Sequence, residues 1–160
     1  MHTTDADAPP RVVALLGYGG LLPFLALAAA SWVTDFAGQA APVWQSALLA
    51  YGAVILSFVG ALHWGFAMTL RDLPTLQRTA SFVWSVAPAL IAWLALLAML
   101  AAPVAASALL VVGFVSHYWR DARLAAHNDL PAWYLPMRLR LTSVACLCLM
   151  VPLLKRFLEG

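Results

Sequence analysis

Long runs of hydrophobic residues, separated by short polar segments, dominate the chain. Each run approaches the roughly 20 residues that a helix needs to cross the hydrocarbon core of a bilayer. Runs of this length without strict alternation predict helices rather than strands. We therefore expect an all-α polytopic membrane bundle of five transmembrane helices, at about residues 12–33, 46–70, 80–100, 104–119 and 137–158.

The segments outside these runs are short. Residues 1–11 are polar and predict a disordered tail, and residues 12–160 form the membrane domain. The first run is too long for the apolar core of a signal peptide, so we expect a retained helix. Ala101-Ala102-Pro103 predicts a tight turn between two antiparallel helices, and residues 120–136 form the longest predicted connection.

Prolines and small residues predict local features of these helices. Pro23 removes a backbone donor and should kink the first helix near Gly19, while Pro88 should loosen the backbone around Trp84. A face of small residues on the first helix should allow another helix to approach closely. This face comprises Gly19, Pro23, Ala26 and Ala30.

Composition supports the membrane class and excludes others. Hydrophobic residues make up 64% of the chain and charged residues 10%, whereas soluble domains have roughly 45–50% and about 25%. The net charge of +2 is small and forms no patch of the size that nucleic acid binding needs. We expect the lipid bilayer as a partner and no nucleic acid.

The distribution of basic residues predicts the orientation. With the N-terminus inside, the inner side carries Arg11, Arg71, Arg78, Arg120, Arg123, Arg138 and Arg140, and the outer side carries Lys155 and Arg156. Because loops rich in Lys and Arg stay in the cytoplasm, we expect the N-terminus inside and the C-terminus outside.

This orientation gathers the candidate functional residues near the inner leaflet. His63 is a titratable residue on a helix of membrane length, which is the usual mark of a functional site. At similar depth we expect Tyr18, Trp64, Trp84, Ser85, His117, Trp133, Tyr134, Arg138 and Arg140. The aromatic rings suit either the headgroup level or the wall of a ligand pocket, and the arginines suit anionic lipid contact.

Three roles are open for His63. It can form a structural hydrogen bond to a neighbouring helix, contact a ligand or handle protons, or ligate haem together with His117. The chain has no CxxCH, HExxH or GxSxG motif and no phosphate-binding glycine loop. We place the carboxylates in tails, loops or helix ends and therefore expect no buried acid pair. Cys146 and Cys148 point apart on a helix and predict two small buried hydrophobic residues.

Four blocks follow one another along the chain: LGYGGLLPF at 16–24, YGAVILSFVGALHWGFAM at 51–68, WSVAPALIAWLAL at 84–96 and LPAWYLPMRLRLT at 130–142. In these blocks the chain resembles the domain of unknown function 3429 family of small integral membrane proteins. The resemblance implies a bacterial or mitochondrial inner-membrane location and no established activity. The blocks contain His63, Trp64, Pro88, Trp133, Tyr134, Arg138 and Arg140.

Our leading hypothesis is a non-enzymatic accessory or assembly factor of a membrane-protein complex in the bacterial cytoplasmic (inner) membrane. It needs no catalytic constellation and no cofactor. The second hypothesis is a quinone- or lipid-binding module with an inner-leaflet pocket around His63. The third is a haem protein that binds through His63 and His117.

Overall fold

The protein is all-helical in the part of the chain that its computed structural model describes, residues 8–33, 41–70, 73–128 and 130–159. The helices are α1 (Arg11–Gly19), α2 (Leu21–Val33), α3 (Ala41–Gly60), α4 (Leu62–Thr69), α5 (Thr75–Met99), α6 (Pro103–Ala125) and α7 (Tyr134–Glu159). Most of the predicted tail, at residues 1–7, lies outside the described residues, as do residues 34–40, Arg71 and the side chains of Lys155 and Arg156.

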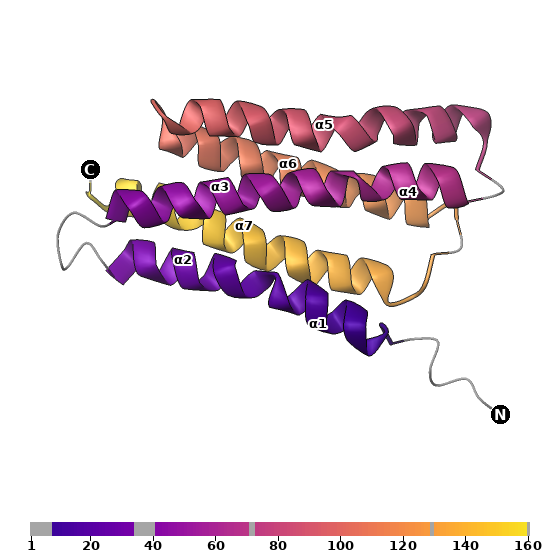
Figure 1. Ribbon diagram of the computed structural model, residues 1–160, viewed down its shortest axis with the longest axis horizontal. Coiled ribbons are helices and arrows are strands. Elements are labelled where there is room, and N and C mark those ends of the chain that lie inside the picture. The colour runs from indigo at the N-terminus through magenta and orange to yellow at the C-terminus, as the bar shows by residue number, and fades with distance from the viewer. Residues whose placement is uncertain (1–7, 34–40, 71–72, 129, 160) are drawn as a thin grey trace.

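The helices form an up-and-down bundle in which α1 continues into α2 and α3 into α4 (Figure 1). The start of α1 and the end of α7 lie at opposite ends of the bundle (Figure 1). Among the described residues, four segments are long and apolar enough to cross a membrane: Arg11–Val33, Pro42–Thr69, Thr75–Met99 and Tyr134–Val151. The helix α6 is equally long, but Arg120, Asp121 and Arg123 occupy its last turns.

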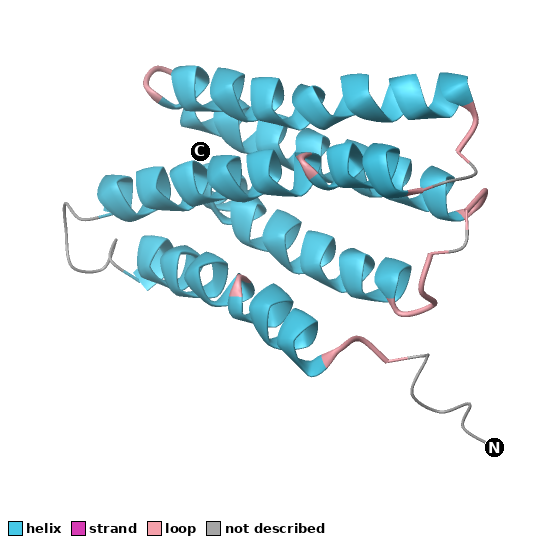
Figure 2. Ribbon diagram, turned by 45° about the vertical axis from the view of Figure 1, so that its right-hand side comes forward, coloured by secondary structure: helices cyan, strands magenta, loops and turns pink. Residues whose placement is uncertain are grey.

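The α1–α2 helix pair and the α3–α4 helix pair are each interrupted once, as the pink breaks in Figure 2 show. The first break falls at Gly20, between α1 and α2, which confirms the kink predicted near Gly19. The second falls at Ala61, whose N–H donates to the Phe58 carbonyl at 3.2 Å. By contrast, α5 runs unbroken through Pro88.

Several helices extend further than the sequence predicted. The helix α6 reaches Ala125 instead of residue 119, so the connection to α7 covers residues 126–133 and not 120–136. The charged residues Arg120, Asp121 and Arg123 lie within α6 and do not end it. The Asn128 side chain donates to the Leu124 carbonyl at 2.8 Å and so caps the C-terminal end of this helix. The helix α7 begins at Tyr134, because Pro136 lies in the first turn, where no intrahelical donor is needed.

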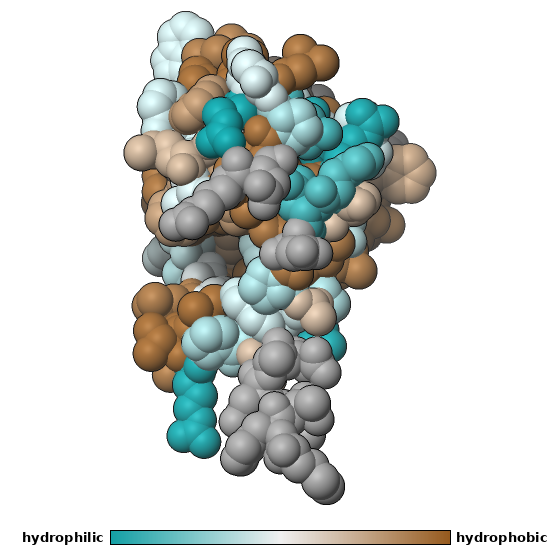
Figure 3. Space-filling view, turned by 90° about the vertical axis from the view of Figure 1, so that its right-hand side faces the viewer, coloured by the Kyte–Doolittle hydropathy of each residue, from teal (hydrophilic) through white to brown (hydrophobic). Residues whose placement is uncertain are grey.

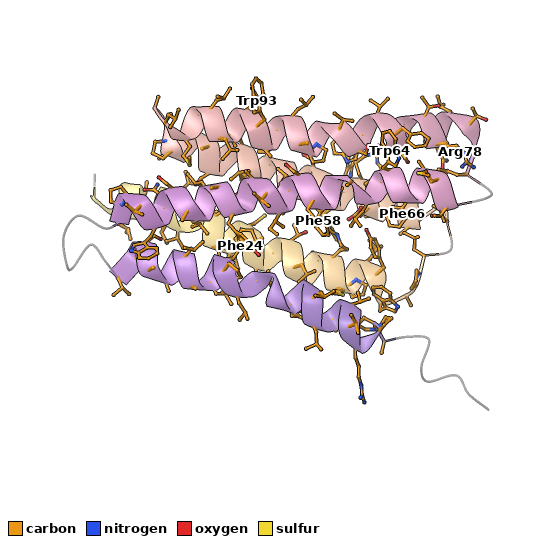
Figure 4. The ribbon with its side chains drawn as sticks, in the orientation of Figure 1. Phe24, Phe58, Trp64, Phe66, Arg78 and Trp93 are labelled. Carbon is orange, nitrogen blue, oxygen red and sulfur yellow. The ribbon has the colours of Figure 1, made fainter. Side chains whose placement is uncertain are left out.

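The core lies where α2, α3, α5, α6 and α7 meet. Its largest members are Phe24, Leu48, Leu49, Leu56, Leu110, Phe114 and Leu149. Figure 4 shows Phe24 extending from α2 toward α3 and α7, whereas Trp93 points away from the bundle. The predicted small-residue face was wrong, because Gly19 and Ala26 are exposed and α2 buries Phe24, Ala28 and Ser31 instead.

Close approach of α3 to α5 depends on one glycine. A Cβ atom added at Gly60 would lie 2.9 Å from Cβ of Pro88 and 3.1 Å from the Ser85 carbonyl oxygen. Only a residue without a side chain fits there. Just beyond this contact, Trp64 in the first turn of α4 packs against Phe82 of α5.

Candidate functional site

A buried aspartate, Asp121 on α6, is the centre of a polar cluster inside the bundle. Its Oδ2 accepts a hydrogen bond from Arg138 Nε of α7 at 2.8 Å, and its Oδ1 lies 3.0 Å from His63 Nε2 of α4. His117 Nε2, one helical turn before Asp121, lies 3.8 Å from the same Oδ1. All four side chains are at most 9% exposed. A buried charge of this kind is tolerated only when it is paired and hydrogen-bonded.

Trp84 determines which ring nitrogen of His117 carries the proton. The indole Nε1–H of Trp84 on α5 donates to His117 Nδ1 at 3.3 Å. Because indole nitrogen is only a donor, His117 Nδ1 must carry a lone pair. In the neutral ring the proton then sits on Nε2, which faces Asp121. The rings of His63 and His117 meet edge to face with centroids 5.0 Å apart.

Helix periodicity and the break in the α3–α4 rod bring these groups together. Along α6 the buried positions Leu110, Phe114, His117, Asp121 and Leu124 recur every three or four residues and form one face. Arg138 lies in the second turn of α7, directly beside this face. The break at Ala61 leaves His63 in the first turn of α4, where it is 1% exposed.

A large apolar cavity lies beside the cluster, between α1 and α2, α3 and α4, and α7. Its volume is about 530 Å³. In Figure 1, α1 slants away from α4 on this side of the bundle, and in Figure 4 Phe58 and Phe66 extend from α3 and α4 toward α7 and α1. The walls are almost entirely aliphatic and aromatic. The polar end is formed by Trp133, Tyr134 and Arg138.

Two polar atoms of the residues at this end have no partner among the described residues. They are the Tyr134 hydroxyl and Arg138 Nη2, both fully buried. Leaving a buried donor unsatisfied costs about 1–3 kcal/mol.

Comparison with known proteins gives the family. The model of a family described as "Protein of unknown function (DUF3429)" matches residues 9–154. The chain belongs to the DUF3429 family. No solved structure matches this DUF3429 protein.

A curated relative supports the membrane assignment. Transmembrane protein 69 of Xenopus tropicalis is 36% identical to the DUF3429 chain over 139 residues, which cover 85% of this chain and 51% of the relative. The chain thus spans about half the length of that relative. Together with the four membrane-length apolar segments, this similarity identifies an integral membrane protein.

Some residues predicted for the site of the DUF3429 protein meet there, and others do not. His63, Trp84, His117 and Arg138 join the cluster, and Trp133, Tyr134 and Arg138 line the cavity. Four predicted residues belong to neither. Trp64 is half exposed against Phe82, Ser85 binds the Phe82 carbonyl, and Arg140 donates to Tyr18 on the outer surface.

Sequence reasoning missed Asp121. It was placed in a connecting segment and no buried carboxylate was expected, whereas Asp121 is 0% exposed inside α6. The available signal was its spacing of four residues from His117. Continuing the helix past residue 119 puts Asp121 on the same inward face as His117.

Three ligand atoms of the kind that bind metals converge in the DUF3429 cluster. One donor atom from each of His63, His117 and Asp121 lies within 4.8 Å of the others. Two features disfavour a metal there. Arg138 already neutralises Asp121, so a divalent ion would leave a net charge of +2 in a low-dielectric interior. A metal on His117 Nε2 would also place a proton on Nδ1, against the Trp84 donor.

Haem has no space between the two histidines in this arrangement. Rings whose centroids are 5.0 Å apart are in direct contact, and a porphyrin between them would require α4 and α6 to separate. The cluster is best suited to hydrogen bonding. It fixes the position of Arg138 beside the cavity.

Proposed function

We propose that this DUF3429 protein is a non-enzymatic membrane module that binds an isoprenoid quinone in the cavity beside Asp121. The observation that carries the proposal is an apolar cavity of about 530 Å³ whose lining includes Tyr134 and Arg138, each of which has one buried polar atom without a partner among the described residues. Pockets for small organic ligands commonly have about 300–1,000 Å³ and few, convergent polar groups.

The charge balance at the polar end favours a neutral ligand. The positive charge of Arg138 is already paired with Asp121 through a bond of 2.8 Å. What remains is donor capacity, from Arg138 Nη2 and the Tyr134 hydroxyl. A quinone ring offers two carbonyl acceptors without charge, and its isoprenoid tail matches the walls. A phosphate would bring an excess negative charge.

The walls suit an occupant that enters from the bilayer. The cavity lies between α1 and α4 and is lined by such residues as Leu16, Phe58 and Phe66. Val13 and Leu16 on α1 and Phe58 on α3 line the cavity and are still 38%, 74% and 68% exposed, so this wall is open. We propose that the tail extends between α1 and α4 into the hydrocarbon phase.

The topology is part of the same proposal. We propose five membrane passes, with α6 as the fifth, the N-terminus in the cytoplasm and the chain in the bacterial cytoplasmic membrane. The start of α1 and the end of α7 lie at opposite ends of the bundle, which fits an odd number of passes (Figure 1). The polar end of the cavity would then lie near the inner leaflet.

A pair of leucines on α7 tests the cavity. Leu141 lines it, whereas Leu139 is 47% exposed on another face of the same helix. After gentle solubilisation, quinone is extracted from the purified protein and counted per chain. We expect Leu141→Trp to lose the bound quinone and Leu139→Trp to retain it. Equal quinone content in the two variants, or none in the unchanged protein, would overturn the proposal.

A pair of tyrosines tests the polar end. Tyr134→Phe removes the unpartnered hydroxyl, and Tyr18→Phe removes a hydroxyl that lies outside the cavity. With about 1 kcal/mol for the lost hydrogen bond, Tyr134→Phe should weaken quinone affinity roughly fivefold and Tyr18→Phe should leave it unchanged. If neither variant changes affinity while a membrane subunit co-purifies, the accessory role expected from the sequence replaces this proposal.

A further inference from the structure

A second, smaller pocket lies between α5 and α6, at the end of the bundle where α5 begins and α6 ends. It has a volume of about 180 Å³ and is lined by His63, Gln77, Ser81, Arg120, Arg123 and His127, with Ala80 and Leu124. Figure 3 looks onto this end, and hydrophilic side chains gather in its upper half. The pocket has no residue in common with the quinone cavity.

Two arginines of this pocket are held by aromatic rings. The guanidinium carbon of Arg120 lies 5.4 Å from the Trp84 ring centroid, and that of Arg123 lies 3.5 Å from the Trp119 ring centroid. Such cation–π contacts fix a guanidinium group while leaving its N–H donors available. The arginines are therefore positioned before any ligand arrives.

Their charge is not compensated within the described residues. The ion pairs found there all involve Asp121, whose partners are His63, His117 and Arg138. Arg120 Nε is buried and lacks a hydrogen-bond partner in the same part of the chain. The pocket thus combines two positioned cations with spare donors.

We propose that this pocket binds the phosphate of an anionic lipid headgroup. A volume of about 180 Å³ falls below the roughly 300 Å³ at which pockets for whole organic ligands begin, so it suits a single group. Arginine forks match phosphate oxygens in a bidentate manner. The pocket lies at an end of the bundle, next to Trp119, which is 52% exposed. Headgroup phosphates lie at this level of a membrane.

The test compares two double variants with the same loss of charge. Arg120→Gln with Arg123→Gln alters the pocket. Arg11→Gln with Arg140→Gln removes two exposed arginines at the same end of the bundle, outside the pocket. Each protein is placed in nanodiscs of phosphatidylcholine with a small fraction of phosphatidylglycerol. Retained phosphatidylglycerol is then counted by native mass spectrometry, and folding is checked by circular dichroism.

At about 1.5 kcal/mol for each lost hydrogen bond to a charged group, the pocket variant should hold phosphatidylglycerol on the order of 100-fold more weakly. The control variant should resemble the unchanged protein. Equal losses in both variants would overturn the proposal, because they indicate a diffuse surface charge. Displacement of the lipid by millimolar inorganic phosphate would overturn the lipid assignment in favour of free phosphate. Quinone content should not change in either variant, which separates this test from that of the proposed function.

Discussion

Replacing Asp121 by asparagine should destabilise the protein strongly, because it leaves the Arg138 charge buried without a counterion. Asp121 is 0% exposed and Arg138 is 7% exposed, and their bond is 2.8 Å long. Removing one partner of a buried ion pair costs about 3–5 kcal/mol. That is a large part of the roughly 5–15 kcal/mol that holds a typical domain together.

A double-mutant cycle separates this effect from general damage. Arg138→Gln alone should cost a similar amount, since it strands the carboxylate. Asp121→Asn combined with Arg138→Gln removes both charges, so its loss should be at least about 2 kcal/mol smaller than the sum of the single losses. Unfolding in mixed detergent micelles, followed by circular dichroism against the SDS fraction, gives the four free energies.

The control for this cycle is Arg140→Gln, which removes an exposed arginine two residues away on the same helix. It should unfold close to the unchanged protein. If Asp121→Asn lies within about 1 kcal/mol of the unchanged protein, well below the cost of a broken buried pair, the reasoning is refuted. The carboxylate would then not carry a buried charge pair in the folded state.

Three further predictions concern packing, the histidine tautomer and the end of α6. Gly60→Val should cost about 1–3 kcal/mol by overpacking against Pro88, whereas Gly65→Ala, with no atom within 4 Å of the added Cβ, should change the unfolding free energy little. Trp84→Phe should cost about 1 kcal/mol and release the fixed His117 tautomer, which nitrogen-15 NMR of labelled histidine detects. Trp93→Phe, on the outward face, should do neither. Asn128→Ala should speed amide hydrogen exchange in residues 122–126, because it removes the bond to the Leu124 carbonyl.

Much of the fold follows from the length of the apolar runs. A run such as 80–100 has one low-energy arrangement in a bilayer, a helix with its backbone bonds satisfied internally, and α5 covers all of it except residue 100. Hydropathy does not locate the helix ends correctly, because it sums the polarity of successive residues without regard to the face of the helix on which each side chain lies. Arg120, Asp121 and Arg123 therefore suggested a loop, although the helix continues with Asp121 turned inward.

The site was partly predictable for the same reason. His63 and His117 stood out as titratable residues on membrane-length helices, and Arg138 as a cation at a helix start. The depth of a residue in the membrane does not determine the face of the helix on which its side chain lies. Trp64 and His63 are neighbours in sequence, yet Trp64 is 50% exposed and His63 is 1% exposed.

The pairing of Asp121 with Arg138 could not be derived from local pattern. The two residues lie 17 positions apart on different helices, and their contact depends on how α6 packs against α7. The cavity has the same origin. It forms because α1 turns away at Gly20, and no feature of the apolar runs gives the angle of that turn.

Photo-crosslinking with a quinone analogue that carries a diazirine on its ring tests the central claim most directly. The purified protein in nanodiscs is irradiated with the analogue, and the labelled residues are mapped by mass spectrometry. We predict labels on Trp133, Tyr134 and Arg138, with competition by unmodified quinone. Labels spread over outward residues such as Trp93 and Leu97, or labels that unmodified quinone does not displace, would contradict a quinone site in the cavity.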